Sequence, residues 1–200
     1  MSDEDVSRET NERLGIYSAL LEKWNPRINL VSRASLANHR IRHFADSAQL
    51  HDLAPHPVDH WADLGSGGGF PGLVIAILAL DAGSPARVTL VESDVRKSAF
   101  LNTVIRETGV KATVVTGRIE AIPPLKADVL SARALADLTV LLGFADRHLK
   151  PGGTALFPKG VTWQDELRDA QSAWQFTSHV VKSKTEAGPV ILRVRGISRV

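Results

Sequence analysis

The fold of this chain is decided by the stretch Trp61-Ala62-Asp63-Leu64-Gly65-Ser66-Gly67-Gly68-Gly69-Phe70-Pro71-Gly72. A short apolar run ends in a carboxylate, and a glycine-rich turn then leads into the wholly apolar run 73–80. Glycine is favoured where the backbone needs a positive φ or where a ligand approaches the main chain, and proline suits the first turn of a helix. The pattern predicts a strand, a tight turn and a helix, with turn amides facing an electron-rich ligand.

Two kinds of cofactor-binding loop fit these glycines. Asp63 followed by Gly65-x-Gly67-x-Gly69 is the pattern of S-adenosylmethionine-dependent methyltransferases. Gly67-x-Gly69-x-x-Gly72 also satisfies the dinucleotide-binding pattern, which is weak evidence when it stands alone. A glycine-rich turn that binds nothing is the third interpretation. Asp63 is too close to the first glycine to be the ribose-binding acid of a dinucleotide fold, so we expect it at the strand end beside the ligand.

The composition limits the class of protein. Two hundred residues are enough for one α/β domain with a small extension. The chain has no cysteine, which excludes disulfides, thiolate metal ligands and a cysteine nucleophile. The longest apolar run is too short to span a bilayer, and no signal-peptide pattern is present. We therefore expect a cytoplasmic monomer that binds neither a membrane nor a metal ion.

Residues 1–57 are predicted to form a helical N-terminal extension. Leu14, Tyr17, Leu21 and Trp24 recur at helical spacing, and Asn25-Pro26 is expected to end that helix. A second helix is expected from about residue 35 to residue 53. No acid lies between positions 22 and 46, and basic side chains are concentrated there, among them Arg27, Arg33, His39, Arg40, Arg42 and His43. They form either a solvated surface or an RNA-facing basic cap, and charge alone does not decide between the two.

Residues 58–200 alternate predicted strands and helices, as expected for a methyltransferase-type or dinucleotide-type domain. Strands are expected at 61–64, 87–92, 112–116, 129–132 and 154–157, the last preceded by a turn at 150–153. Helices are expected after Pro71, between Asp94 and Gly109, at 137–149 and at 164–174. Repeated strand–helix units imply a parallel sheet covered on both faces. Two final strands, 176–182 and 190–195, imply an antiparallel edge.

The ends of these strands carry the candidate binding residues. In such a sheet the ligand lies across the carboxyl ends of the strands. Glu92 ends the second strand and can accept hydrogen bonds from both hydroxyls of an adenosine ribose; pairing with Arg96 is the alternative. Arg133 ends the fourth strand and is expected to point into the cleft. Lys159 follows the fifth strand and is expected to meet a substrate phosphate.

A family resemblance rests on motifs spread over almost the whole chain. These motifs are Trp24-Asn25 with Asn29-Leu30, Arg42-His43-x-x-Asp46-Ser47, the stretch from Asp63 to Gly72, Arg118-x-Glu120, Ser131-x-Arg133-Ala134 and Lys159-Gly160. Together they resemble the bacterial small-subunit ribosomal RNA guanine-N7 methyltransferase family, also called the glucose-inhibited division protein B family. The resemblance implies a Rossmann-like class I methyltransferase sheet with a helical N-terminal extension. It also implies methyl transfer from S-adenosylmethionine to guanine N7 in 16S rRNA, as naked RNA or in the small subunit.

The resemblance also bears on individual residues. Family cofactor-contact positions fall on Gly65, Phe70, Ile119, Glu120 and Arg133. With the glycine turn and the strand ends added, the expected cofactor-binding set is Asp63, Gly65, Gly67, Gly69, Phe70, Glu92, Ile119, Glu120 and Arg133. Arg133 and Lys159 are the expected substrate-positioning residues. Glu92 stands where an aspartate is common, and Gly68 replaces a common proline.

The absence of certain motifs disfavours some classes of methylation reaction. Carbon-5 pyrimidine methylation commonly uses a cysteine, and the Pro-Pro pair of this chain lies before the fourth strand, unlike the motif of adenine-N6 enzymes. Guanine N7 has an exposed lone pair and no proton to remove, so positioning alone can support the transfer. Two alternatives remain: a nicotinamide-dependent dehydrogenase and a non-catalytic RNA-binding assembly factor. The missing Tyr-x-x-x-Lys pattern disfavours the first, and the intact Asp63, Gly65 and Glu92 disfavour the second.

Overall fold

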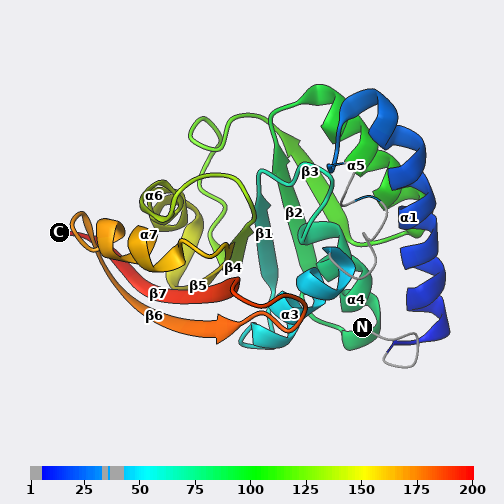
Figure 1. Cartoon of the computed structure of the whole chain (residues 1–200). Coiled ribbons are helices and arrows are strands. Elements are labelled where there is room, and N and C mark those ends of the chain that lie inside the picture. The colour runs from blue at the N-terminus through cyan, green and yellow to red at the C-terminus, as the bar shows by residue number, and fades with distance from the viewer. Residues whose placement is uncertain (1–5, 33–35, 37–42) are drawn as a thin grey trace.

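The computed structural model describes residues 6–32, 36 and 43–200. A seven-stranded sheet with strand order β3-β2-β1-β4-β5-β7-β6 runs through the molecule (Figure 1). The strands are β1 (His60–Leu64), β2 (Arg87–Glu92), β3 (Ala112–Thr116), β4 (Ala127–Ala132), β5 (Leu149–Lys159), β6 (Trp174–Lys182) and β7 (Val190–Arg199). Strands β1 to β5 pair in parallel, whereas β7 pairs antiparallel with both β5 and β6. The predicted mostly parallel sheet with an antiparallel C-terminal edge is confirmed.

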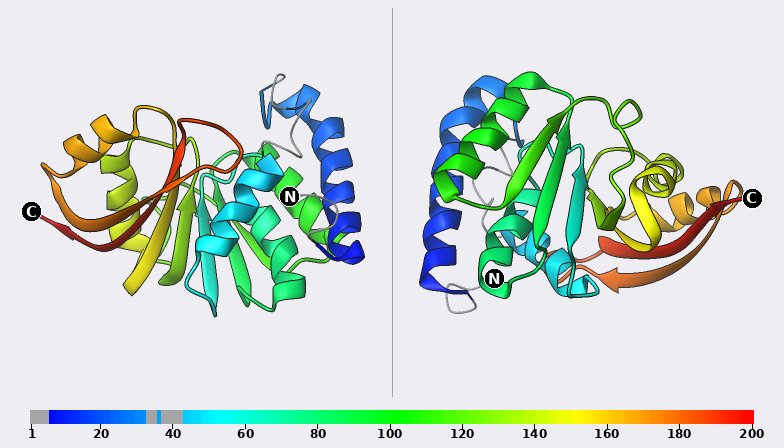
Figure 2. Two further views of the ribbon diagram at one scale, coloured as in Figure 1. Left: turned by 60° about the horizontal axis from the view of Figure 1, so that its bottom comes forward. Right: turned by 180° about the vertical axis from the view of Figure 1, so that it is seen from behind.

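Helices cover both faces of this sheet (Figures 1 and 2). The described helices are α1 (Arg8–Ile28), α3 (Ala45–Leu53), α4 (Gly72–Ala82), α5 (Val95–Thr108), α6 (Leu138–His148) and α7 (Trp163–Ala170). Helices α4 and α5 pack on one face, and α1 packs against both of them, while α6 and α7 lie on the other face. Because side chains alternate along a strand, Trp61 of β1 joins the core under α4 and Leu64 joins the core under α6.

The first helix belongs to the same hydrophobic core as the sheet. Leu14, Tyr17 and Leu21 are each at most 1% exposed and lie in one cluster with Phe70 and Phe100. The predicted helical stripe is confirmed, with Trp24 partly buried beside it. The described part of the N-terminal extension is therefore packed against the rest of the chain, and a domain boundary near residue 57 stays a prediction.

The first helix ends later than expected. It continues through Pro26 to Ile28, and Asn29 then adopts a left-handed conformation with φ of 50°. The Asn25 side chain accepts hydrogen bonds from the backbone N–H groups of Leu30 and Val31, both at 2.8 Å. These contacts pair backbone donors just beyond the helix, so the chain reverses after Ile28 rather than at the proline.

Only part of the second predicted helix can be compared with the structure. Its C-terminal half is α3, which confirms that part of the prediction. Arg33, Arg40 and Arg42, three of the predicted RNA-binding residues, lie outside the described residues.

Two boundaries in the C-terminal half differ from the predictions. The predicted turn at 150–153 lies within β5, where the pairing with β4 shifts register between Leu149 and Thr154. Helix α7 ends at Ala170, and Trp174 begins β6 instead of ending the helix. Trp174 is 5% exposed and packs into the core beneath α6, so tertiary burial rather than helical periodicity determines its position.

No helix in the described ranges is both long and apolar enough to cross a membrane.

Candidate active site

The glycine-rich turn joins the end of β1 to the start of α4 and has a backbone that requires glycine. Gly67 has a φ of 53° and Gly69 a φ of 93°, a region that other residues rarely adopt. A Cβ on Gly69 would lie 2.4 Å from Cδ1 of Leu73 and 2.7 Å from the hydroxyl oxygen of Tyr17. The turn is thus packed tightly against α1 on one side, and its other side is left for a ligand.

A cavity of about 530 Å³ opens beside this turn, within the size range of small-molecule sites. The turn, the ends of β2 and β4, and the loop after β3 form its walls. Predicted cofactor residues in its lining are Gly65, Gly67, Phe70, Glu92, Ile119, Glu120 and Arg133. Further lining residues that the sequence did not single out include Leu30, Lys97, Leu135 and Phe144. These residues reach the cavity because segments that are distant in sequence pack together, and no local sequence pattern indicates such packing.

Glu92 is held in one orientation at the end of β2. It is 7% exposed, and its two carboxylate oxygens accept backbone hydrogen bonds from Gly67 and Asp94, both at 2.8 Å. The alternative pairing with Arg96 does not form, because Arg96 pairs with Asp94 at 3.0 Å. Each carboxylate oxygen can accept more than one hydrogen bond, so Glu92 fits the two hydroxyls of a ribose.

The loop after β3 is held in place by α6. Ile119, which lines the cavity, is 8% exposed, and its carbonyl accepts a hydrogen bond from Nε2 of His148 at 3.0 Å. The neighbouring Arg147 donates to the carbonyl of Ile122 at 2.9 Å. Burial lowers the pKa of His148, which favours the neutral ring that makes this bond. Together, these contacts fix the loop, and Ile119 and Phe144 provide an apolar slot in this wall of the cavity.

Asp63 lies beneath the turn, and among the described residues neither it nor Gly69 belongs to the cavity lining. Its fully buried carboxylate accepts hydrogen bonds from Oγ of Ser131 at 2.7 Å and from the N–H of Gly72 at 3.2 Å. Burial raises the pKa of Asp63 to about 6, against the lowering effect of these hydrogen bonds. The structure thus gives Asp63 a supporting place, joining β1, β4 and the start of α4, where we had expected a side chain beside the ligand.

Arg133 connects the end of β4 to the N-terminal part of the chain. Its Nη1 donates to Nδ1 of His43 at 2.9 Å, and its guanidinium carbon lies 5.0 Å from the ring centroid of Phe70. The Phe70 ring also stacks on Tyr17, whose hydroxyl donates to the carbonyl of Gly68 at 2.5 Å. His43, predicted to contact RNA, therefore contacts a residue that lines the cavity. Arg27 is exposed in the last turn of α1.

A second cavity of about 400 Å³ adjoins the first. Arg133, Ala134 and Ala136 line both cavities, and α3, the end of β5, α7 and the β6–β7 loop complete the second one. Lys159 is 9% exposed there; it donates to the carbonyl of Ala136 at 3.0 Å and pairs with Glu166 at 2.5 Å. Because its charge is buried and already paired, this position does not suit the RNA phosphate that the sequence led us to expect.

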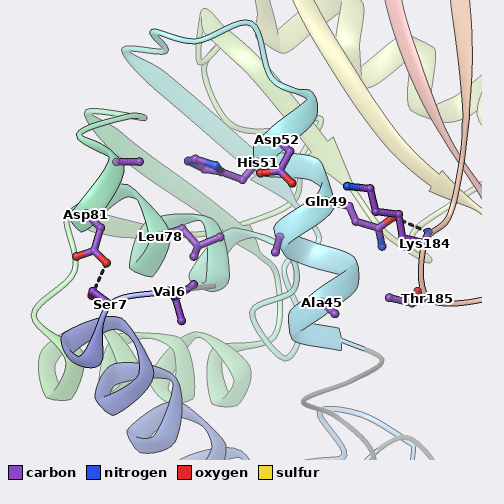
Figure 3. A pocket seen from close by; sticks show the side chains of 12 residues that line it. Val6, Ser7, Ala45, Gln49, His51, Asp52, Leu78, Asp81, Lys184 and Thr185 are labelled. Carbon is purple, nitrogen blue, oxygen red and sulfur yellow. Dashed lines mark hydrogen bonds between the residues drawn. The ribbon is translucent and has the colours of Figure 1, made fainter. Parts of the chain in front are cut away.

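A third cavity, of about 680 Å³, lies between α3, the end of α4 and the β6–β7 loop (Figure 3). Ser7 donates a hydrogen bond to Asp81 on one side of it, and the backbone N–H of Lys184 donates to Gln49 on the other. Its described lining contains none of the predicted site residues. The glycine-rich turn, not this cavity, is therefore the candidate active site.

A mostly parallel seven-stranded sheet with an antiparallel C-terminal edge, a glycine-rich turn after β1 and a fixed acid at the end of β2 is the arrangement of class I S-adenosylmethionine-dependent methyltransferases. Solved structures agree on the fold. M. jannaschii TYW2 in complex with AdoMet is 12% identical, with a TM-score of 0.58 over 85% of this chain and 78% of that chain. A mutant of MtNAS in complex with S-adenosylmethionine is 18% identical, with a TM-score of 0.61 over 93% and 75%.

Sequence comparison then identifies the family. The model of GidB, described as rRNA small subunit methyltransferase G, matches residues 10–190. The ribosomal RNA small subunit methyltransferase G of Ruegeria pomeroyi is 56% identical over 98% of this chain and 96% of its own length. The protein of the same description from Rhodospirillum centenum is 52% identical over 96% and 87%. The chain belongs to the rRNA small subunit methyltransferase G family, which confirms the resemblance and excludes the dehydrogenase and non-catalytic alternatives.

Proposed function

We propose that the acceptor atom of this methyltransferase is N7 of a guanine in the 16S rRNA of the small ribosomal subunit. The observation that carries the proposal is the pair of adjoining cavities that meet at Arg133, Ala134 and Ala136. The first has the fixed acid and the apolar slot that an adenosine-containing cofactor needs, and the second is large enough for one nucleobase. A methyl group at their boundary has one reactant on each side.

The residues present fit S-adenosylmethionine. The Glu92 carboxylate is oriented for ribose hydroxyls by two backbone donors, and Ile119 with Phe144 lines the slot for adenine. When bound, the cofactor supplies an electrophilic methyl group on a positively charged sulfur. Guanine N7 accepts this group with its lone pair, so no side chain has to remove a proton. The work of the protein is to hold N7, carbon and sulfur in line.

Arg133 is the side chain best placed to position a reactant. Its contacts with His43 and Phe70 fix its guanidinium at the boundary of the cavities. Burial lowers the pKa of Arg133, while the charges of Asp46 and Asp63 oppose this effect, and arginine stays protonated in proteins. Arg133 therefore offers a fixed positive charge to an anionic group of the cofactor or of the RNA.

The proposal also covers the surface that contacts RNA, the oligomeric state and the cellular compartment. Arg27, Arg33, Arg40, Arg42 and His43 are the proposed RNA-facing residues of the N-terminal segment. We infer that the protein acts as a monomer in the cytoplasm, where small subunits are made. Methyl transfer to an unprotonated ring nitrogen needs neither an activated water nor a metal ion.

The test is methyl transfer from labelled S-adenosylmethionine to rRNA taken from cells that lack this protein. Naked 16S rRNA, immature particles and small subunits serve as parallel substrates, and the product is digested to nucleosides and separated by mass spectrometry. We expect label in 7-methylguanosine with at least one of these substrates. Label in any other nucleoside, or none with all three substrates, contradicts the proposal. Calorimetry should show binding of S-adenosylmethionine or its homocysteine product, and none of NAD.

A further inference from the structure

We propose that Lys159 and Glu166 act as a pair that recognises guanine in the second cavity. The proposal rests on the proposed function, because it concerns the base whose N7 is methylated. The two side chains carry opposite charges and pair with each other, so they do not suit an RNA phosphate. The proposal gives them a role in selecting the base instead.

The pair is built into the wall of this cavity. Lys159 lies at the end of β5 and Glu166 lies in α7, and both line the cavity. Oε2 of Glu166 forms an ion pair with the ammonium of Lys159 at 2.5 Å and accepts a hydrogen bond from the backbone N–H of Leu138 at 2.9 Å. The Lys159 ammonium also donates to the carbonyl of Ala136 at 3.0 Å. Each charged group is thereby held in position by contacts to main chain and to its partner.

One donor and one acceptor of the pair remain for a ligand. An ammonium has three N–H donors, and two of those on Lys159 are used. Oε1 of Glu166 accepts no hydrogen bond from the residues that the structure describes. Guanine presents the matching groups side by side, since its O6 accepts a hydrogen bond and its N1–H donates one. Adenine has the reverse order. Its 6-amino group is a donor that would face the Lys159 donor, and its N1 is an acceptor that would face the Glu166 acceptor.

The order of the groups also fits the direction of methyl transfer. Ala136 lies on the wall shared with the cofactor cavity, Lys159 contacts Ala136, and Glu166 contacts Lys159. Around the edge of guanine the order is N7, O6 and N1. A guanine that presents N7 to the shared wall therefore presents O6 to Lys159 and N1–H to Glu166.

The remaining lining suits an extruded base. Pro71, Pro158 and Ile191 provide apolar surface, which a flipped nucleobase contacts while its edge is read by hydrogen bonds. The other acids of the cavity are less suited to this role. Asp46 accepts hydrogen bonds from Gln49 and Thr185, and Glu186 lies exposed in the β6–β7 loop.

The test is competition by mononucleotides against methylation of 16S rRNA or small subunits by the wild-type protein. Guanosine, inosine and adenosine 5′-monophosphates are compared; inosine keeps both O6 and N1–H but lacks the 2-amino group. We expect the guanosine and inosine nucleotides to inhibit at similar concentrations, and the adenosine nucleotide about 10- to 100-fold more weakly. Equal inhibition by all three, or inosine behaving like adenosine, overturns the proposal.

The matched variants are Glu166→Gln and Asp165→Asn. Both remove one negative charge from α7, but Asp165 is exposed and pairs with Arg168 outside the cavity. We expect Glu166→Gln to abolish the preference for guanosine over adenosine nucleotides while S-adenosylmethionine affinity is kept, and Asp165→Asn to keep both. A Glu166→Gln protein that keeps the preference contradicts the pair. The wild-type competition decides the question even if this variant does not fold.

Failure of the inference and failure of the proposed function are distinguishable. If the wild-type protein forms 7-methylguanosine but shows no nucleotide preference, only the Lys159–Glu166 pair is wrong. If it forms no 7-methylguanosine, the proposed acceptor is wrong, and the inference falls with it.

Discussion

Arg133, at the carboxyl end of β4, donates a hydrogen bond to Nδ1 of His43, at a distance of 2.9 Å, across 90 positions of sequence. The same guanidinium lies over the ring of Phe70, and the ring centroid of His43 is 4.9 Å from that of Phe70. A residue from the N-terminal extension thus holds the cation that borders both cavities. The extension therefore contacts a residue that lines both cavities.

This contact predicts that Arg133 and His43 are energetically coupled. Arg133→Lys loses the planar fork that bonds His43 and stacks on Phe70, and His43→Ala removes the acceptor. Each single variant should lower kcat/KM, and the double variant should lose less than the two single losses together, with a coupling of about 0.5–3 kcal/mol. Steady-state methyl transfer to small subunits measures the cycle. Strictly additive losses show that the hydrogen bond does not serve the reaction.

A second prediction concerns the pH dependence of folding. Burial raises the pKa of Asp63 from 3.8 to about 6. A raised pKa in the folded state means that the protonated carboxyl favours folding, so this contribution is fully present below about pH 4 and is lost as pH rises through 6. Asp63→Asn does not titrate. Its free energy of unfolding, relative to wild type, should rise by roughly 2 kcal/mol between pH 4 and pH 7.

Urea unfolding at several pH values measures this difference. Asp59→Asn is the control, because Asp59 is an exposed carboxyl just before the same strand. Asp63→Asn has a constant cost as well, since the amide nitrogen cannot accept a hydrogen bond from Gly72 or Ser131. Only the change with pH tests the argument, and a constant difference between the two proteins refutes it.

Much of the fold could be predicted because its signals are local. Asp94 caps α5 through the N–H groups of Arg96 and Lys97, and Gly109 ends that helix in a left-handed conformation, as the sequence indicated. The second and third strands have the predicted bounds. Glu92 could be placed at the cavity because it ends the strand beside the glycine-rich turn. In a parallel sheet the carboxyl ends of neighbouring strands lie together, and the ligand binds there.

The remaining features depend on contacts between distant segments. Asp63 looks like a ligand-binding acid in the sequence, and only its bond to Ser131 of β4 shows that it faces inward. Lys159 looks like a phosphate-binding cation until Glu166 of α7 is seen to pair with it. His43 lies in a basic segment and in a family motif, but nothing local in the sequence links it to Arg133. Pairings of this kind have no sequence periodicity.

A third prediction tests the cofactor cavity. Glu92→Gln places an amide N–H₂ group against one of the backbone N–H donors of Gly67 and Asp94, and it also removes the charge that strengthens a hydrogen bond to a hydroxyl. S-adenosylmethionine affinity should fall by about tenfold or more. Calorimetry with S-adenosylmethionine measures this affinity directly. Glu107→Gln, an exposed change on α5, should leave affinity unchanged. Equal cofactor affinity in the two variants would show that Glu92 does not bind the cofactor.

A fourth prediction concerns the basic N-terminal residues. If Arg27, Arg33, Arg40 and Arg42 contact phosphates, RNA affinity falls steeply with salt. Changing any one of them to alanine should reduce the slope of log K against log salt by about one, with cofactor affinity unchanged. Arg87→Ala is the matched control, because Arg87 begins β2, at the end of the parallel strands away from the glycine-rich turn, and pairs with Asp59. Unchanged slopes in all four variants identify the segment as a solvated surface.

We propose that methyl transfer to guanine N7 proceeds by positioning, without removal of a proton. Single-turnover methyl transfer, with RNA and S-adenosylmethionine both saturating, tests it most directly. Guanine N7 is unprotonated at neutral pH, and Arg133 stays charged there. The rate should therefore be nearly constant between about pH 6 and 9. A rate that rises tenfold per pH unit shows that a proton leaves before transfer, and it contradicts the assignment of N7 as the acceptor.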